Sequence, residues 1–288
     1  MKRRFFWLVS LPALISILTA VGIADSESRT VEETAHIEHF LAGPSKVSFT
    51  SPEIGESLKW QSCEVRFHPE PPTVRVYQDG KLIFGSPGTA HFTSVAICDL
   101  GDTPEPELII LNDYGGTYPI QDVAILGGAD QKVWYQAEGV PWARLDDFTG
   151  DGVPEFATAD RTVGPFKGYP TLLYEVGPEG LTLSSELMKV RRLPSQDLLQ
   201  EEAAGSDWPD SMMWHFNRSV EIVQNLIYCG RADLARQFFD QGFKPEIATE
   251  DVSAAREAYW NAILQNLEVS PHWPVIVQMN NGSLDDRL

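Results

Sequence analysis

The sequence predicts a mainly β protein with a C-terminal α-helical part, and three observations carry this prediction. Residues 53–190 contain short runs of alternating apolar and polar residues separated by turn signals, which is typical of antiparallel strands. One stretch of this region recurs 48 residues later, which indicates a repeated β unit. Beyond residue 191 the apolar residues follow a helical spacing. We therefore expect a partial β-propeller-like repeat assembly over 53–190 and a helical cap over 191–288.

The first 24 residues have the form of a signal peptide. A basic stretch at residues 2–4 precedes an uncharged run from Phe5 to Ala24, and small residues before Asp25 offer a cleavage site. The run is also long enough to span a bilayer, about 20 residues, so an uncleaved signal anchor is the alternative. The sequence thus predicts a periplasmic or secreted protein whose mature form opens with a polar leader over 25–52.

The charge of the chain excludes one class of partner. The 288 residues include 41 acidic and 22 basic side chains, a net charge of −19, and removal of the signal peptide takes away three basic residues and no acidic one. A surface this acidic repels phosphate backbones and anionic headgroups. We therefore expect no nucleic acid partner and no membrane contact unless the signal sequence stays uncleaved. The expected partner is a protein or a glycan of the cell envelope.

The chain, which we expect to be exported, contains three cysteines: Cys63, Cys98 and Cys229. Thiols can oxidise outside the cytosol, and at most one internal disulfide can form. Cys63 and Cys98 both lie in strand-like runs and are the better pair. The alternative is three buried free thiols, because reduced cysteine is among the most buried residue types.

Turn residues place hairpins within the β region. Asp79 and Gly80 stand between alternating apolar and polar residues of the run 73–84, a strong hairpin signal. Similar candidates lie at 132–140 and near Gly180.

The most informative stretch is DFTGDGVPEF, residues 147–156. Oxygen-bearing side chains fall at loop positions 1, 3, 5 and 9, and a glycine stands at position 6, where a calcium loop turns sharply. Hard oxygen ligands favour calcium over zinc. A metal-free tight turn is the alternative, because aspartate and glycine also dominate ordinary turns. The predicted ligands are Asp147, Thr149, Asp151, the carbonyl of Val153, and Glu155.

An eroded copy of this loop precedes it. Aligning Pro106-Glu107 with Pro154-Glu155 puts Asp99 opposite Asp147. At residues 101–104 this copy lacks the second oxygen donor, the central aspartate and the turn glycine of the later loop. We therefore expect an ion at the second copy and none at the first.

Residues 147–156 resemble the Asp-rich calcium loop of FG-GAP/VCBS-type repeats, and the resemblance covers about residues 70 to 190. It implies propeller-blade strands joined by loops that bind calcium structurally and are not catalytic. This sequence departs from the family pattern at Thr149, where aspartate or asparagine is usual, and it has too few repeats to close a ring of four or more blades.

The C-terminal region predicts three helices, over 212–229, 232–241 and 250–267. Gly230 and Gly242 follow the first two in the position of a C-terminal cap. We expect these helices to pack on the β part.

Two functions from different classes follow. The first is an exported, non-catalytic binding or assembly module whose β-repeat domain is stabilised by calcium. The second is an exported hydrolase that uses the acidic loop and a metal to activate water. The sequence has no zinc-protease, nucleophile-elbow or phosphate-loop motif, so we assign no catalytic residue.

Overall fold

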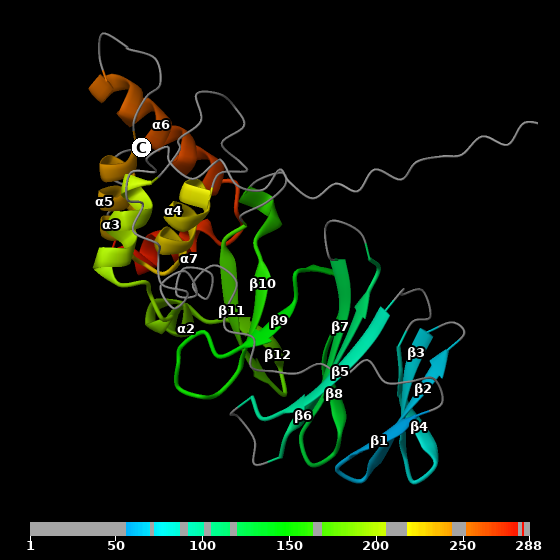
Figure 1. Ribbon diagram of the computed structural model, residues 1–288. Coiled ribbons are helices and arrows are strands. Elements are labelled where there is room, and N and C mark those ends of the chain that lie inside the picture. Colours follow the sequence, from blue (N-terminus) through cyan, green and yellow to red (C-terminus); the bar gives the residue numbers. More distant parts are fainter. Residues whose placement is uncertain are drawn as a thin grey trace, which may run out of the picture.

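The computed structural model describes residues 56–69, 72–86, 92–100, 105–115, 120–163, 169–205, 218–243, 252–281 and 284 (Figure 1). The predicted signal peptide and polar leader lie outside these residues, as does the centre of the eroded loop. Across the described residues the chain is mainly β with a C-terminal helical part, which confirms the coarse fold class that the sequence predicts.

The strands form three antiparallel sheets of four strands each, and within each sheet the strands lie in chain order. Each sheet is thus one continuous meander. The first contains β1–β4, the second β5–β8 and the third β9–β12. The strands are β1 (Ser57–Trp60), β2 (Cys63–Pro69), β3 (Pro72–Gln78), β4 (Lys81–Gly85), β5 (Phe92–Cys98), β6 (Glu107–Asp113), β7 (Ile120–Gly127), β8 (Lys132–Pro141), β9 (Arg144–Asp146), β10 (Glu155–Ala159), β11 (Thr171–Gly177) and β12 (Gly180–Leu183).

Two of the three predicted hairpins are present. Asp79 and Gly80 join β3 to β4 with φ of 50° and 77°, the left-handed backbone that a two-residue hairpin turn requires. Gly180, also at positive φ, opens β12 after the turn from β11. The hairpin predicted at 132–140 is wrong: this run is the single long strand β8, which pairs with β7. Its turn signal, Gly139 at φ 70°, lies where the β7–β8 register shifts.

The sheets stack in series, with an apolar layer between neighbours. One cluster, which includes Trp60, Val76 and Ile110, fills the space between the first and second sheets. A second, which includes Ile109, Ile125 and Phe156, lies between the second and third. The middle sheet is therefore covered on both faces, which is why β6 is buried along almost its whole length and has consecutive apolar residues from Leu108 to Leu111 rather than alternating ones.

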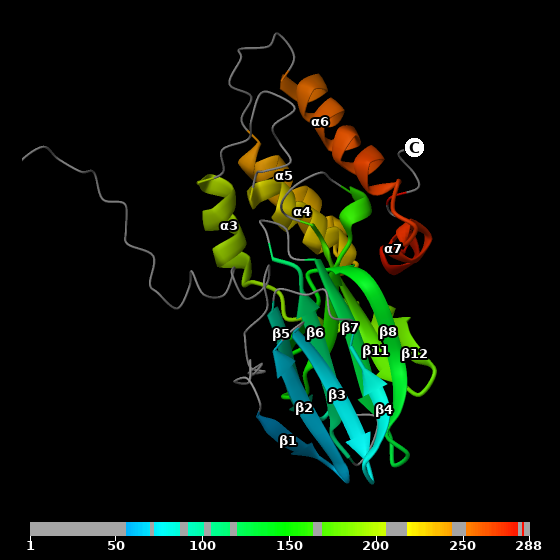
Figure 2. The same ribbon diagram turned by 90° about the vertical axis from the view of Figure 1, so that its right-hand side faces the viewer.

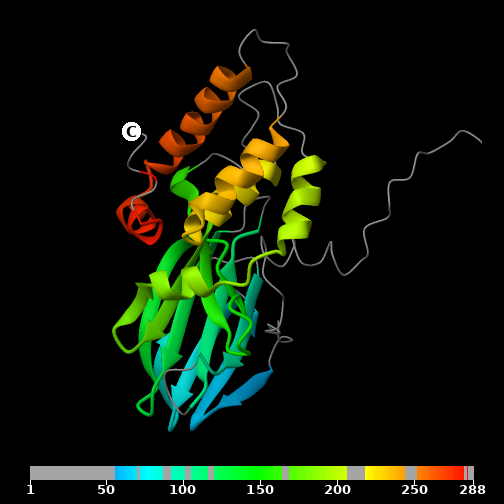
Figure 3. The ribbon, with the colours of Figure 1, turned by 90° about the vertical axis from the view of Figure 1, so that its left-hand side faces the viewer.

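Helices pack against the third sheet on its remaining side: α2 crosses the strands, and the larger helices lie mainly beyond the strand ends (Figures 1 and 3). The helical cluster joins Leu172 and Leu173 of β11 to buried residues of the helices such as Leu226 and Trp260. No helix in the described part of the chain is long and apolar enough to cross a membrane. The helices are η1 (Arg161–Val163), α2 (Ser185–Val190), α3 (Gln196–Ala204), α4 (Arg218–Tyr228), α5 (Ala232–Gly242), α6 (Val252–Leu267) and α7 (Trp273–Met279).

The cap predicted after the first helix is present. Gly230 has φ 70°, its N–H donates to the carbonyl of Ile227, and the N–H of Arg231 donates to that of Leu226. A Cβ at Gly230 would stand 3.0 Å from the carbonyl oxygen of Met279 in α7. The glycine therefore both ends α4 and lets α7 approach.

The three cysteines are free thiols, which agrees with the second of the two alternatives that the sequence left open, and Cys63 and Cys98 are not paired. Cys63 is buried in the layer between the first and second sheets, whereas Cys98 packs against the layer on the opposite face of the second sheet. The second sheet separates the two side chains.

Candidate metal centre

The acidic loop connects β9 to β10, the first two strands of the third sheet. Asp147, Asp151 and Glu155 each offer a carboxylate oxygen, and these oxygens all lie within 4.8 Å of one another. Asp147 and Glu155 are buried, with 2% and 6% of their surface exposed, whereas Asp151 is exposed. The loop thus gathers three of the five predicted ligands into one half-buried group.

Backbone amides shape the loop around Asp147. Its Oδ1 accepts from the N–H of Gly150 at 2.7 Å, and its Oδ2 accepts from the N–H of Gly152 at 3.1 Å. Gly150 and Gly152 have φ of 85° and 99°, a backbone that other residues rarely adopt. The two glycines at loop positions 4 and 6 therefore allow the chain to wrap around one carboxylate.

Glu155 closes the loop from the other end. Its Oε2 accepts from the N–H of Phe148 at 2.6 Å, and its Oε1 accepts from the hydroxyl of Thr149 at 2.8 Å. Burial raises the pKa of Glu155 above its ordinary value of 4.5, and the hydrogen bonds from Thr149 and Phe148 oppose this shift. Keeping Glu155 ionised in this buried site therefore costs free energy, and a nearby cation would offset that cost.

The two other predicted ligands have different roles in this structure. Thr149 directs its hydroxyl to Glu155. The N–H of Val153 donates to Oδ1 of Asp151 at 2.8 Å, and the Val153 side chain is 38% exposed.

The hydrogen bonds within the loop leave room for a cation. A carboxylate oxygen has two lone pairs, so an oxygen that accepts one N–H can still bind a metal ion. Three carboxylates with the Thr149 hydroxyl beside them are the hard oxygen donors that calcium takes in flexible geometry, whereas magnesium demands a tighter octahedron. The residues present therefore fit calcium.

The eroded copy keeps the hydrogen bond that closes the loop. The N–H of Leu100 donates to Oε2 of Glu107 at 3.0 Å, and Leu100 and Glu107 are the counterparts of Phe148 and Glu155 at the offset of 48 residues. Glu107 is fully buried. Residues 101–104 lie outside the described residues, so the expectation that this copy holds no ion stays a prediction.

Phe148 ties the second copy to the helical layer. Its ring is 2% exposed and belongs to the helical cluster, and its carbonyl accepts from the N–H of Arg192, which follows α2, at 2.9 Å. The guanidinium carbons of Arg144 and Arg191 lie 5.5 and 5.3 Å from the ring centre. Loop position 2 is therefore an anchor into the next layer.

The buried Arg191 extends this joint to α4. Its Nη1 donates to Oδ1 of Asn225 at 2.9 Å, and the same oxygen accepts from the N–H of Thr171 in β11 at 3.2 Å. Arg144 donates to the hydroxyl of Thr171 at 3.1 Å, and burial lowers the pKa of Arg144 to about 10. Sequence reasoning missed these residues, because an arginine pair at 191–192 is typical of a solvated linker.

The two loops anchor in the same way, one layer apart. Leu100 packs against the cluster between the second and third sheets, and Phe148 enters the cluster between the third sheet and the helices. An apolar residue at position 2 of both copies was the sequence signal for this role. The helices therefore contact the third sheet through its loop residue Phe148, as the third sheet contacts the second through Leu100.

Comparison with protein-family models, with curated proteins and with solved structures found no match.

Proposed function

We propose that this protein is a non-catalytic binding or assembly module in which calcium, bound by the acidic loop, stabilises the β-repeat domain. The observation that carries the proposal is the group formed by Asp147, Asp151 and Glu155, with Thr149 beside it. Three carboxylates within one turn repel one another, and a divalent cation turns that repulsion into attraction.

The position of the loop supports a structural role for the ion. Phe148 follows the first ligand directly, and both its ring and its carbonyl contact the helical side of the joint. An ion that fixes the backbone at Asp147 and Thr149 therefore also fixes Phe148, which lies between them. On this account calcium holds the third sheet and the helical layer in register, which is a role in assembly rather than in chemistry.

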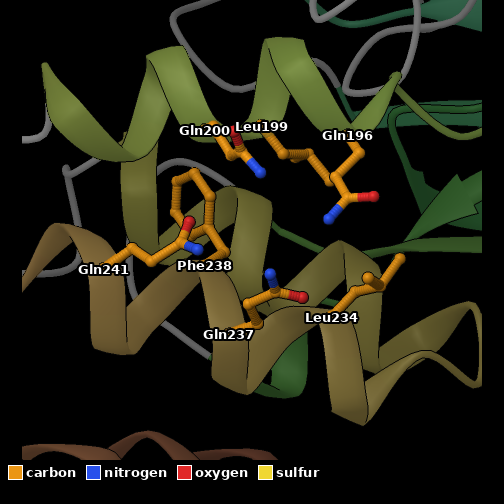
Figure 4. A pocket seen from close by; sticks show the side chains of 7 residues that line it. All are labelled: Gln196, Leu199, Gln200, Leu234, Gln237, Phe238 and Gln241. Carbon is orange, nitrogen blue, oxygen red and sulfur yellow. The ribbon is translucent and has the colours of Figure 1, made fainter.

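The alternative, a metal-dependent hydrolase, needs an open coordination position inside a cleft. One groove among the described residues lies away from the loop, between α3 and α5, and is lined by four glutamines, two leucines and Phe238 (Figure 4). It contains no acidic residue and no residue of the loop, so it gives this alternative no support.

The repeat architecture is, in our proposal, a partial propeller-like assembly of FG-GAP/VCBS type. Three successive four-stranded meanders stacked face to face, with matching loops between the first two strands of the second and third, support it. The helices would then take the position of a fourth sheet in the stack. The calcium loop would hold them against the third sheet.

We further propose that the protein is exported, on the basis of its N-terminal sequence. N-terminal sequencing of the native protein tests this: a mature form that begins near Asp25 supports export with cleavage, and an intact Met1 in a membrane fraction supports the signal anchor.

Thermal unfolding tests the calcium proposal. An ion that binds only the folded state stabilises it by about 2.7 kcal/mol at a hundredfold excess over Kd. For a chain of this size that raises Tm by roughly 5 to 10 °C. We expect this rise on replacing chelator with millimolar calcium, and Glu179→Gln, in the exposed β11–β12 turn, serves as the control with one carboxylate fewer. An unchanged Tm would show that the loop is only a turn.

A further inference from the structure

The outer face of the first sheet is uncovered by any other described layer. Val65, Val76 and Phe84 face inward, into the cluster shared with the second sheet. The opposite face points away from the rest of the molecule, at the end of the stack remote from the helices (Figures 1 and 2). It carries polar side chains, as the terminal unit of a repeat stack must if it meets water.

Two arginines stand side by side on this face. In the register between β2 and β3, Arg66 lies directly opposite Arg75, and both are exposed. Like charges directly opposite one another on a sheet are destabilising. Arg66 pairs with Glu64 at 2.7 Å and lies 4.5 Å over the ring of Tyr77. For Arg75 the described residues offer no ion pair or hydrogen bond, so its guanidinium faces solvent.

This face differs in charge from the rest of the chain. Residues 57–85 contain four basic and three acidic side chains, whereas residues 87–288 contain 13 basic and 31 acidic ones. Lys59 lies opposite Glu64 in the β1–β2 register and is exposed, so it stands on the same face as the arginines. Lys59, Arg66 and Arg75 therefore outweigh Glu64 there.

We propose that this face binds an acidic glycan, with carboxylates of successive sugar units held by Arg66 and Arg75. A guanidinium group binds a carboxylate through two parallel N–H donors, so arginine is better suited than lysine to bind the carboxylates of a glycan. Tyr77 lies opposite Leu82 in the β3–β4 register, and Leu82 is 49% exposed. Arg66 covers one face of the Tyr77 ring, so the exposed Leu82 beside it supplies the apolar contact for the carbon face of a sugar ring.

The size of the face favours a polymer over a globular partner. Four strands of up to seven residues present an area of roughly 14 by 24 Å, about 340 Å². A stable protein interface needs about 800 Å² from each partner. A second copy docked face to face would also place one arginine pair against the other. A glycan chain that crosses the strands needs only this area, and it gains affinity from repeated charges.

The proposal names the partner class of the binding module, and it is tested without the metal. The probe is a fluorescently labelled oligogalacturonate, titrated in chelator against the wild-type protein and against Arg66→Gln/Arg75→Gln. Each lost charged hydrogen-bond partner weakens binding by roughly tenfold or more. The matched control is Lys132→Gln/Lys189→Gln, which removes the same net charge from two exposed lysines outside the face. We expect it to bind like the wild type.

Both arginines are exposed, so the variant should fold, and loss of the like-charge pair should leave its melting curve unchanged or shift it upward. Failure of the wild-type protein to bind, or equal binding by the arginine variant, would overturn the proposal. Binding of poly-glutamate as tight as that of the glycan would assign the face to an acidic peptide instead. These outcomes are separate from the calcium proposal, because they leave the calcium-dependent change in Tm untouched.

Discussion

The backbone N–H of Phe148 donates to Oε2 of Glu155 at 2.6 Å, which closes the acidic loop. The same residue, Phe148, places its ring in the core of the helical layer. One contact therefore joins the candidate ligand Glu155, at the start of β10, to the packing between the third sheet and the helices. A disturbance at the loop should reach the helices, and the reverse also holds.

Phe148→Ala tests this joint. Removing a fully buried phenylalanine leaves a cavity and lowers the free energy of unfolding by about 3 to 5 kcal/mol. Urea unfolding followed by tryptophan fluorescence and far-UV circular dichroism measures the loss. Val153→Ala, in the same loop but exposed, should change it by no more than about 0.5 kcal/mol. Equal stability of the two variants would contradict the role of Phe148 as an anchor.

The pH dependence of stability tests the environment of Glu155. Its pKa is raised in the folded state, so the stability that it contributes is fully present below the unfolded value and is lost as pH rises through the folded pKa. In chelator, the wild-type protein should therefore lose free energy of unfolding relative to Glu155→Gln as pH rises above about 4.5.

Calcium should reverse this trend, because the ion binds the ionised carboxylates and protons compete with it. The calcium-dependent gain in stability should then shrink as pH falls. Urea unfolding of both proteins across this range, with and without calcium, measures the effect. A constant difference between wild type and Glu155→Gln in chelator would rule out a raised pKa.

We expect the three free cysteines to react slowly with thiol reagents in the native protein. Burial, together with Glu107 and Asp99, raises the pKa of Cys98 to about 12, and burial raises the pKa of Cys63 and Cys229. Because the thiolate is the reactive form, we expect slow alkylation of the native protein near pH 8. Unfolding without reductant should expose all three thiols to a thiol reagent. A count of one would instead show that two of the cysteines form a disulfide.

Local signals predicted much of the β part. Asp79 and Gly80 specify their turn by themselves, because few other pairs adopt positive φ twice in succession. The alignment of Glu107 with Glu155 also predicted a relationship that the structure shows as the same hydrogen bond in two sheets. Gly230 marked the end of α4 for a similar local reason.

Contacts between segments that are far apart in the chain could not be predicted from the sequence. A hairpin was predicted at 132–140, and only the pairing with β7 shows that this run is one strand with a bulge near Gly139. Nothing in the sequence marks Arg191 as buried, yet it is 3% exposed and donates a hydrogen bond to Asn225, 34 positions later. For the metal centre, the sequence named the three carboxylates that gather, but not the anchoring of Phe148 among the helices.

Equilibrium dialysis against calcium tests directly whether the acidic loop binds the ion. We expect one bound ion per folded chain. Asp151→Asn should weaken binding by roughly tenfold or more, since the number of ligand charges sets calcium affinity. Asp151 is exposed, so this variant keeps the buried part of the loop, and Glu179→Gln should bind like the wild type. No bound calcium in the wild type, or equal binding by Asp151→Asn, would contradict a calcium site at this loop.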